Sequence, residues 1–144
     1  MVCAWIYKLV RVKNLLLFRW LSPTIWRKTV DLNTFPKHSR LCGQEHIAAL
    51  YKQGKRFTAW PLRVTYMPTE EQTQVLVWAP ISLFKRAVKR NHLRRLMREA
   101  YRLHQDLLGE QHYLIAFNYM DKEEQTYAVI EKAVCKALNK INGK

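Results

Sequence analysis

Residues 84–102 read FKRAVKRNHLRRLMREAYR, and the fold can be worked out from this stretch. It contains no glycine or proline and is rich in helix-favouring residues, so it predicts a long helix that begins soon after Pro80, with Ser82 as its N-cap. Apolar residues recur every three or four positions, which predicts that one face is buried in the domain. The predicted stripe consists of Phe84, Val88, Leu93, Leu96, Met97, Ala100, Leu103 and Leu107.

The other face of this helix is strongly basic. Its nineteen residues hold eight Lys or Arg and one acid, which is half of the chain's formal net charge of +14. A solvated surface helix usually pairs opposite charges four residues apart, but only Glu99 is available here. Arginines crowded together without carboxylates repel one another unless phosphates neutralise them. The pattern therefore favours nucleic-acid binding over an ordinary solvated face.

Shorter elements are predicted on both sides of the basic helix. A helix between Phe35 and Gly54, with Gly54 as its C-cap, precedes two strands. A third strand and an amphipathic helix over residues 123–140 follow the basic helix. The order helix, strand, strand, helix, strand, helix predicts an α+β fold, a two-layer sandwich. The predicted strands are Phe57 to Met67, Gln74 to Ala79 and His112 to Met120.

The remaining composition indicates one domain in a reducing compartment. With 144 residues in all, the chain predicts a single domain over residues 34–144. Residues 1–33 are expected to be a disordered extension, or the product of a start site assigned too far upstream. They contain neither a membrane-spanning stretch nor a secretory cleavage pattern, and the cysteines are scattered along the chain. A cytoplasmic protein without a membrane partner is therefore expected.

No residue pattern predicts catalysis by the protein itself. The eleven acids are mostly single, and the five histidines lack metal-ligand spacing. No serine or glycine-rich loop fits a nucleophile or phosphate motif. We therefore predict no catalytic residue and no metal ligand in this chain.

The basic helix resembles the signature helix of the ribonuclease P protein family, whose core reads approximately K-x-A-V-x-R-N-R-hydrophobic-K-R-x-hydrophobic-R-E. The matching residues are 86–91 (RAVKRN), 94–95 (RR) and 98–99 (RE). Residues 35–41 (FPKHSRL) resemble the opening of the family, and residues 51–55 (YKQGK) resemble the end of its first helix. The resemblance covers about residues 34–140.

This resemblance implies a small sandwich with a left-handed βαβ crossover and a role as the protein subunit of an endoribonuclease. The partner would be ribonuclease P RNA, which carries the active site and holds the Mg²⁺ ions, with one protein per RNA. The protein itself would bind no cofactor. It would bind this RNA and the 5′ leader of precursor tRNA, and so promote removal of the leader to give the mature tRNA 5′ end.

Carried onto this chain, the resemblance places RNA contacts on the basic helix and leader contacts in a cleft between the first helix and the sheet. Aromatic side chains suit an unpaired leader because they stack on bases without requiring a sequence. Core packing is the alternative for each aromatic. The predicted RNA contacts are Lys85, Arg86, Lys89, Arg90, Asn91, Arg94, Arg95 and Arg98, and the cleft candidates are Tyr51, Phe57, Tyr66 and Trp78.

Three positions depart from the family pattern. His92 stands where the motif has its second arginine, and it is neutral more often than charged at pH 7. Ile81 and Ser82 stand where relatives usually carry a basic pair. Each replacement removes positive charge from the expected RNA face.

Other functions compete with this interpretation. A different RNA-binding module, such as a ribosome-associated protein, would not distinguish precursor from mature tRNA. A helix-turn-helix DNA-binding protein is disfavoured because strands flank the basic helix. A membrane-surface protein is disfavoured because the apolar stripe of the basic helix is needed for the core.

Overall fold

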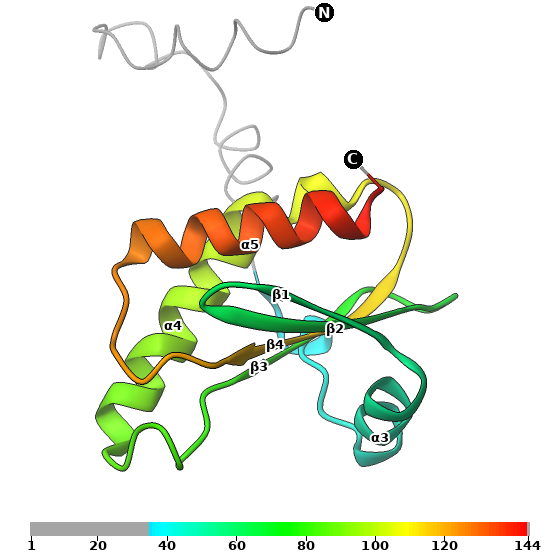
Figure 1. Cartoon of the computed structure of the whole chain (residues 1–144). Coiled ribbons are helices and arrows are strands. Elements are labelled where there is room, and N and C mark those ends of the chain that lie inside the picture. Colours follow the sequence, from blue (N-terminus) through cyan, green and yellow to red (C-terminus); the bar gives the residue numbers. More distant parts are fainter. Residues whose placement is uncertain (1–34, 144) are drawn as a thin grey trace, which may run out of the picture. The chain divides into compact units, whose positions relative to one another are not determined.

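The computed structural model describes residues 35–143, and the predicted extension over residues 1–33 lies outside this range. Within residues 35–143, a four-stranded sheet and three α-helices form the fold, so the predicted α+β class is confirmed. α5 (Tyr127–Ile141) crosses one face of the sheet and packs against α4 (Ala87–His104). The short α3 (Gln44–Gln53) covers part of the opposite face (Figure 1).

The sheet has the strand order β1-β2-β4-β3, which places the last strand in the chain at its centre. β4 pairs with β2 in antiparallel fashion and with β3 in parallel fashion. Parallel neighbours need a long crossover, and α4 provides it between β3 and β4. The left hand of this crossover stays a prediction. The strands are β1 (Lys55–Ala59), β2 (Leu62–Pro68), β3 (Gln74–Trp78) and β4 (Tyr113–Tyr119).

The single strand predicted from Phe57 to Met67 is wrong, because this range contains a hairpin. Ala59 of β1 pairs with Leu62 of β2 across a turn at Trp60 and Pro61, whose peptide bond is cis. Proline has no N–H to donate to a strand ladder, so the chain turns here. Both halves are rich in residues that favour strands, and composition therefore does not reveal the turn.

α4 begins later than predicted. Arg86 is its N-cap, not Ser82. The chain before it forms a turn in which the carbonyl of Pro80 accepts hydrogen bonds from the N–H groups of Leu83 and Phe84, both at 3.3 Å. The proline and this turn keep residues 80–86 out of the helix.

The buried stripe of α4 differs from the predicted one at both ends. Val88 is 80% exposed and Leu103 is 40% exposed, whereas Leu93, Met97 and Ala100 are completely buried. Tyr101, which is 4% exposed, continues the stripe in place of Leu103. Tyr101 follows the buried Met97 by four residues, about one helical turn, whereas Leu103 follows it by six and points to another side. The predicted members Phe84, Leu96 and Leu107 do contact the core.

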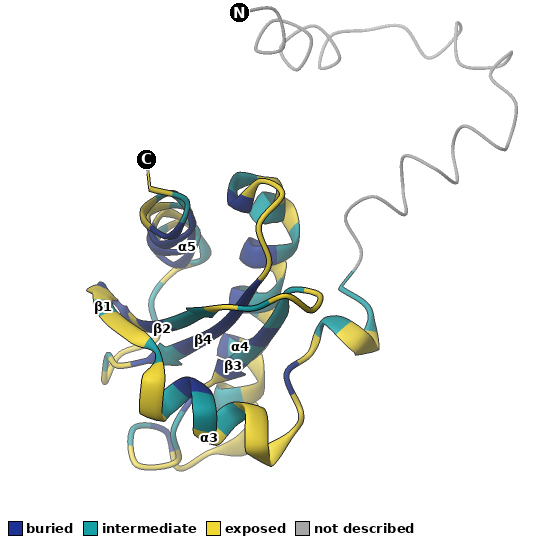
Figure 2. Ribbon diagram, turned by 90° about the vertical axis from the view of Figure 1, so that its right-hand side faces the viewer, coloured by how far each residue is buried: buried dark blue, intermediate teal, exposed yellow. Residues whose placement is uncertain are grey.

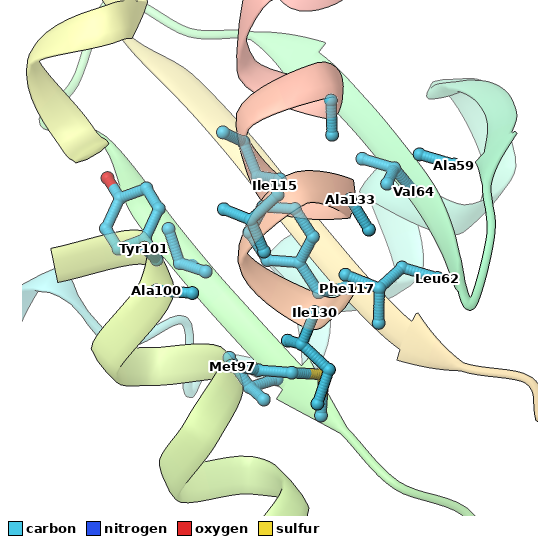
Figure 3. Close-up of a cluster of buried hydrophobic side chains, with 14 of the residues drawn as sticks. Ala59, Leu62, Val64, Met97, Ala100, Tyr101, Ile115, Phe117, Ile130 and Ala133 are labelled. Carbon is cyan, nitrogen blue, oxygen red and sulfur yellow. The ribbon is translucent and has the colours of Figure 1, made fainter. Parts of the chain in front are cut away.

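Two apolar clusters fill the two sides of the sheet. The larger one lies between the sheet and the pair α4 and α5, where Phe117, Met97 and Ile130 meet (Figure 3). The smaller one lies under α3 and contains Leu41, Leu50, Leu114 and Ala116. β4 supplies residues to both clusters, and all of its residues except Asn118 are buried (Figure 2). The orientation of every other element therefore depends on β4.

The start of the described chain is attached to the free side of β3. Arg40 forms an isolated parallel bridge with Val75, and the N–H of Leu41 donates to the Val75 carbonyl at 3.1 Å. The predicted C-cap Gly54 is confirmed at the end of α3. A Cβ at Gly54 would lie 2.3 Å from the Leu50 carbonyl oxygen and 2.9 Å from Cγ2 of Thr65. Glycine therefore allows α3 to approach β2 closely.

Gly54→Ala is expected to lower the free energy of unfolding by about 1–3 kcal/mol, because the added methyl group overpacks against backbone. Gly43→Ala is the matched control, since a Cβ there would meet only the side chain of His46, whose ring is able to rotate away. Chemical denaturation of both variants checks the prediction. Equal stability of the two variants would contradict it.

Candidate nucleic-acid interface

The basic ridge, defined here as Arg86, Arg90, Arg94 and Arg98, runs along one side of α4. Arg86 is exposed at the N-cap, and the other three arginines are half-buried. All eight predicted RNA contacts therefore lie on α4, at its N-cap or on the residue before it. The flanking members, Lys85, Lys89, Asn91 and Arg95, are exposed.

Arg90 also has a structural role. Its Nη1 donates hydrogen bonds to the carbonyl oxygens of Phe84 and Lys85, at 2.8 and 2.7 Å. These bonds attach the turn before α4 to the first turns of the helix. The side chain of Arg90 is therefore partly engaged within the protein, and its loss would disturb the start of the ridge as well as its charge.

Arg94 contacts an aromatic ring of the sheet. Its guanidinium carbon lies 5.7 Å from the centre of the Trp78 indole, at the end of β3. The Nε atom of Arg94 is buried and has no hydrogen-bond partner within the described range. The aromatic contact therefore fixes the position of this side chain on the ridge.

Arg98 lies close to several other positively charged side chains. Partial burial lowers the pKa of its guanidinium, and the nearby charges of Arg40, Arg94 and Arg95 lower it further. Arg40 comes from the segment before α3, and its guanidinium carbon lies 5.7 Å from the centre of the Phe35 ring. These guanidinium groups repel one another, so an anion bound among them would be stabilised.

Two ion pairs limit the excess charge on α4. Lys89 Nζ lies 3.0 Å from Glu124, and Arg102 lies 2.6 Å from Glu99. The hydrogen bond from Arg102 lowers the pKa of Glu99. Lys89 is therefore less free to contact a phosphate than Lys85 is.

A cleft next to the ridge lies between α3 and the ends of the strands; we call it the α3 cleft. It is an open cleft with a volume of about 480 Å³, and its walls include Tyr51, Arg63, Trp78, Asn118 and Met120. Arg63, Asn118 and Trp78 form a row across β2, β4 and β3, because Asn118 is the direct neighbour of both other residues. The hydroxyl of Tyr51 donates to Oδ1 of Asn118 at 2.9 Å, which joins α3 to this row.

The structure brings together only two of the four predicted cleft aromatics, Tyr51 and Trp78. Phe57 and Tyr66 pack against the larger core on the other face of the sheet, with ring centres 5.8 Å apart. Nζ of Lys140 in α5 lies 4.8 Å from the centre of the Phe57 ring. Side chains alternate between faces along a strand, and these two aromatics fall on the α5 side.

Sequence reasoning missed three polar residues of this surface: Arg40, Arg63 and Asn118. Asn118 carries a weak sequence signal, since it interrupts the apolar strand sequence YLIAFNY. Arg63 lies within the predicted strand and carries no distinct sequence signal. Arg40 lies in the segment that resembles the family opening, yet only the folded chain places it beside Arg98.

The departures from the family pattern do not share one surface, because His92 lies two residues from both Arg90 and Arg94 on α4 and therefore points away from the basic ridge. His92 and Ile81 are exposed, and Ser82 lines the α3 cleft. Among residues 35–143, no group of three or more His, Cys, Asp or Glu side chains is arranged to hold a metal ion. In the same range, no helix is long and apolar enough to cross a membrane.

These features define a class of small basic α+β proteins in which a cationic helix borders an aromatic cleft. The family model described as Ribonuclease P matches residues 35–142. The chain belongs to the ribonuclease P protein family. This membership makes it the protein component of a ribonuclease with an RNA partner.

Individual relatives agree with this assignment. The ribonuclease P protein component of Porphyromonas gingivalis is 38% identical over 117 residues, covering 74% of this chain and 85% of the relative. That of Chlorobaculum tepidum is 32% identical over 104 residues, covering 60% and 68%.

Solved structures show the same fold. The RNase P protein from Thermotoga maritima superposes with a TM-score of 0.63 at 18% identity, covering 71% of this chain and 96% of that one. The RNase P protein of Staphylococcus aureus gives a TM-score of 0.62 at 18% identity, covering 72% and 94%.

Arg90→Ala is expected to lower the free energy of unfolding by about 1–2 kcal/mol, because two hydrogen bonds from a charged group are lost. Arg95→Ala is the matched control, since Arg95 is exposed on the same helix. Thermal melting of both variants without RNA provides the measurement. If Arg95→Ala destabilised the fold as much as Arg90→Ala, the structural role of Arg90 would be refuted.

Proposed function

We propose that this chain binds ribonuclease P RNA through the basic ridge and the 5′ leader of precursor tRNA through the α3 cleft. The observation that carries the proposal is the direct contact between the two surfaces, where Arg94 of the ridge lies against Trp78 of the cleft. A polyanion on the ridge and an unpaired strand in the cleft would therefore be neighbours. Such an arrangement suits a protein that holds a catalytic RNA and its substrate together.

The chemistry of each surface supports this division of roles. Guanidinium groups bind phosphates through two parallel hydrogen bonds, and four of them lie one helical turn apart on the ridge. In the cleft, Tyr51 and Trp78 offer aromatic surface to unpaired bases. Arg63 offers positive charge to the phosphate backbone of the leader that connects these bases. The amide of Asn118 offers hydrogen bonds to base edges or to ribose hydroxyls.

In the proposed reaction, the RNA subunit holds the Mg²⁺ ions and activates the water that cleaves the leader. The protein contributes substrate affinity and donates no catalytic group. The complex would act as an endoribonuclease with one protein per RNA in the cytoplasm. Reconstitution with the RNA subunit at low Mg²⁺, scored for leader release from precursor tRNA, tests this function. Equal affinity for precursor and mature tRNA would instead favour a general RNA-binding protein.

The double variant Arg95→Ala, Arg98→Ala is expected to bind ribonuclease P RNA more weakly and with less dependence on salt. Each lost phosphate contact reduces the slope of log K against log salt by about 0.7–0.9. Lys132→Ala with Lys136→Ala is the control, because it removes the same charge from exposed positions on α5. Binding titrations over a range of salt concentrations compare the two variants. If the two double variants gave the same slope of log K against log salt, the ridge would not be part of the RNA interface.

Tyr51→Ala is expected to weaken binding of leader-bearing tRNA by about 1–3 kcal/mol, because a stacked base is lost. Leaderless tRNA should bind as before. Tyr51→Phe is the control, because it keeps the ring and removes only the hydroxyl that bonds to Asn118. Tyr51 also contacts the smaller core, so melting temperatures are measured on the same samples. A large fall in melting temperature, corresponding to a loss of about 3–5 kcal/mol in the free energy of unfolding, without a leader-dependent loss would remove Tyr51 from the substrate site.

A further inference from the structure

Trp78 is shared between the two surfaces. It lines the α3 cleft, and 49% of it is exposed although the guanidinium of Arg94 lies over its ring. Arg94 is not part of the cleft wall. The indole therefore has a cationic neighbour outside the cleft and open aromatic surface within it.

The ring holds Arg94 in place. The buried Nε has no hydrogen-bond partner in the described part of the chain, so no polar contact at this atom competes with the aromatic one. A guanidinium over an indole is attracted to the negative face of the ring, and its plane also packs against that face. In return, Arg94 restricts the positions that the Trp78 side chain can occupy at the end of β3.

We propose that Arg94 serves both RNA sites at once, binding a phosphate of the catalytic RNA while it supports the Trp78 ring on which a leader base stacks. This inference rests on the proposed function, because it requires both RNA partners. Arg94 acts on the leader through Trp78 and is therefore a positioning residue for the substrate. Phosphate binding by Arg94 also orders its side chain, so RNA on the ridge would favour the ring position that the leader needs.

Lysine separates the two roles of Arg94. An ammonium group keeps the positive charge that a phosphate requires but has no plane to place against an indole. Arg98 provides the matched control, because it lies one helical turn further along the same ridge. Among the described residues, the cation–π contacts involve Arg40, Arg94 and Lys140 but not Arg98. Arg94→Lys and Arg98→Lys should therefore change phosphate binding similarly and leader binding differently.

The experiment uses the holoenzyme reconstituted with ribonuclease P RNA. The dissociation constants of leader-bearing and leaderless tRNA are measured for wild type, Arg94→Lys, Arg98→Lys, Trp78→Ala and the double variant Arg94→Lys, Trp78→Ala. The ratio of the two constants is the leader preference. Melting temperatures are measured for every variant, because RNA without folded protein would lack the leader preference and imitate a loss at Trp78.

Arg94→Lys is expected to reduce the leader preference about two- to fivefold, which is the size of an exposed cation–π contact. Arg98→Lys should leave the preference unchanged. In the Trp78→Ala background, Arg94→Lys should cause no further reduction. Equal preferences for Arg94→Lys and Arg98→Lys, or a full reduction in the absence of the indole, would overturn the inference. A wild-type holoenzyme without any leader preference would overturn the proposed function itself, and this result is visible before any variant is made.

Discussion

Burial of β4 on both faces is the constraint on which the other elements depend. Leu114 and Ala116 point into the smaller core under α3, whereas Ile115 and Phe117 point into the larger core. A strand buried in this way needs a partner on each edge, and β2 and β3 supply them. Because β3 runs parallel to β4, the chain must cross over the sheet between them, and α4 is that crossover. The position of the basic helix therefore follows from the pairing of the central strand.

The same arrangement explains why charge and aromatic surface meet at one place. Asn118, the one β4 residue that is not buried, lies between Arg63 and Trp78 at the end of the sheet. α4 follows Trp78 after the short turn at Pro80, so the ridge starts next to the cleft that this row lines. The ridge and the cleft are therefore adjacent because the connection from β3 to α4 is short.

The sequence predicted those features that depend on local periodicity. Leu93, Met97 and Ala100 follow the helical repeat and are buried, and Gly54 ends α3 as expected. Composition does not reveal the hairpin at Trp60 and Pro61, because two short strands with a tight turn have the composition of one longer strand. Aromatic character alone does not indicate which face of a sheet a residue occupies, and Phe57 and Tyr66 lie on the α5 side, away from the cleft. The contacts of Arg94 with Trp78, and of Arg40 with the ridge, join segments far apart in the chain, and no local pattern encodes them.

The two edges of the sheet are protected against association with other strands in different ways. At β3, the bridge between Arg40 and Val75 occupies part of the edge with the protein's own backbone. β1 is the opposite edge, and its first residues, Lys55 and Arg56, are exposed cations. Charged residues on an edge strand discourage pairing with a second molecule, because two such edges repel one another. The positive charge that suits this protein to RNA would thus also protect newly made chains from aggregation before an RNA partner is bound.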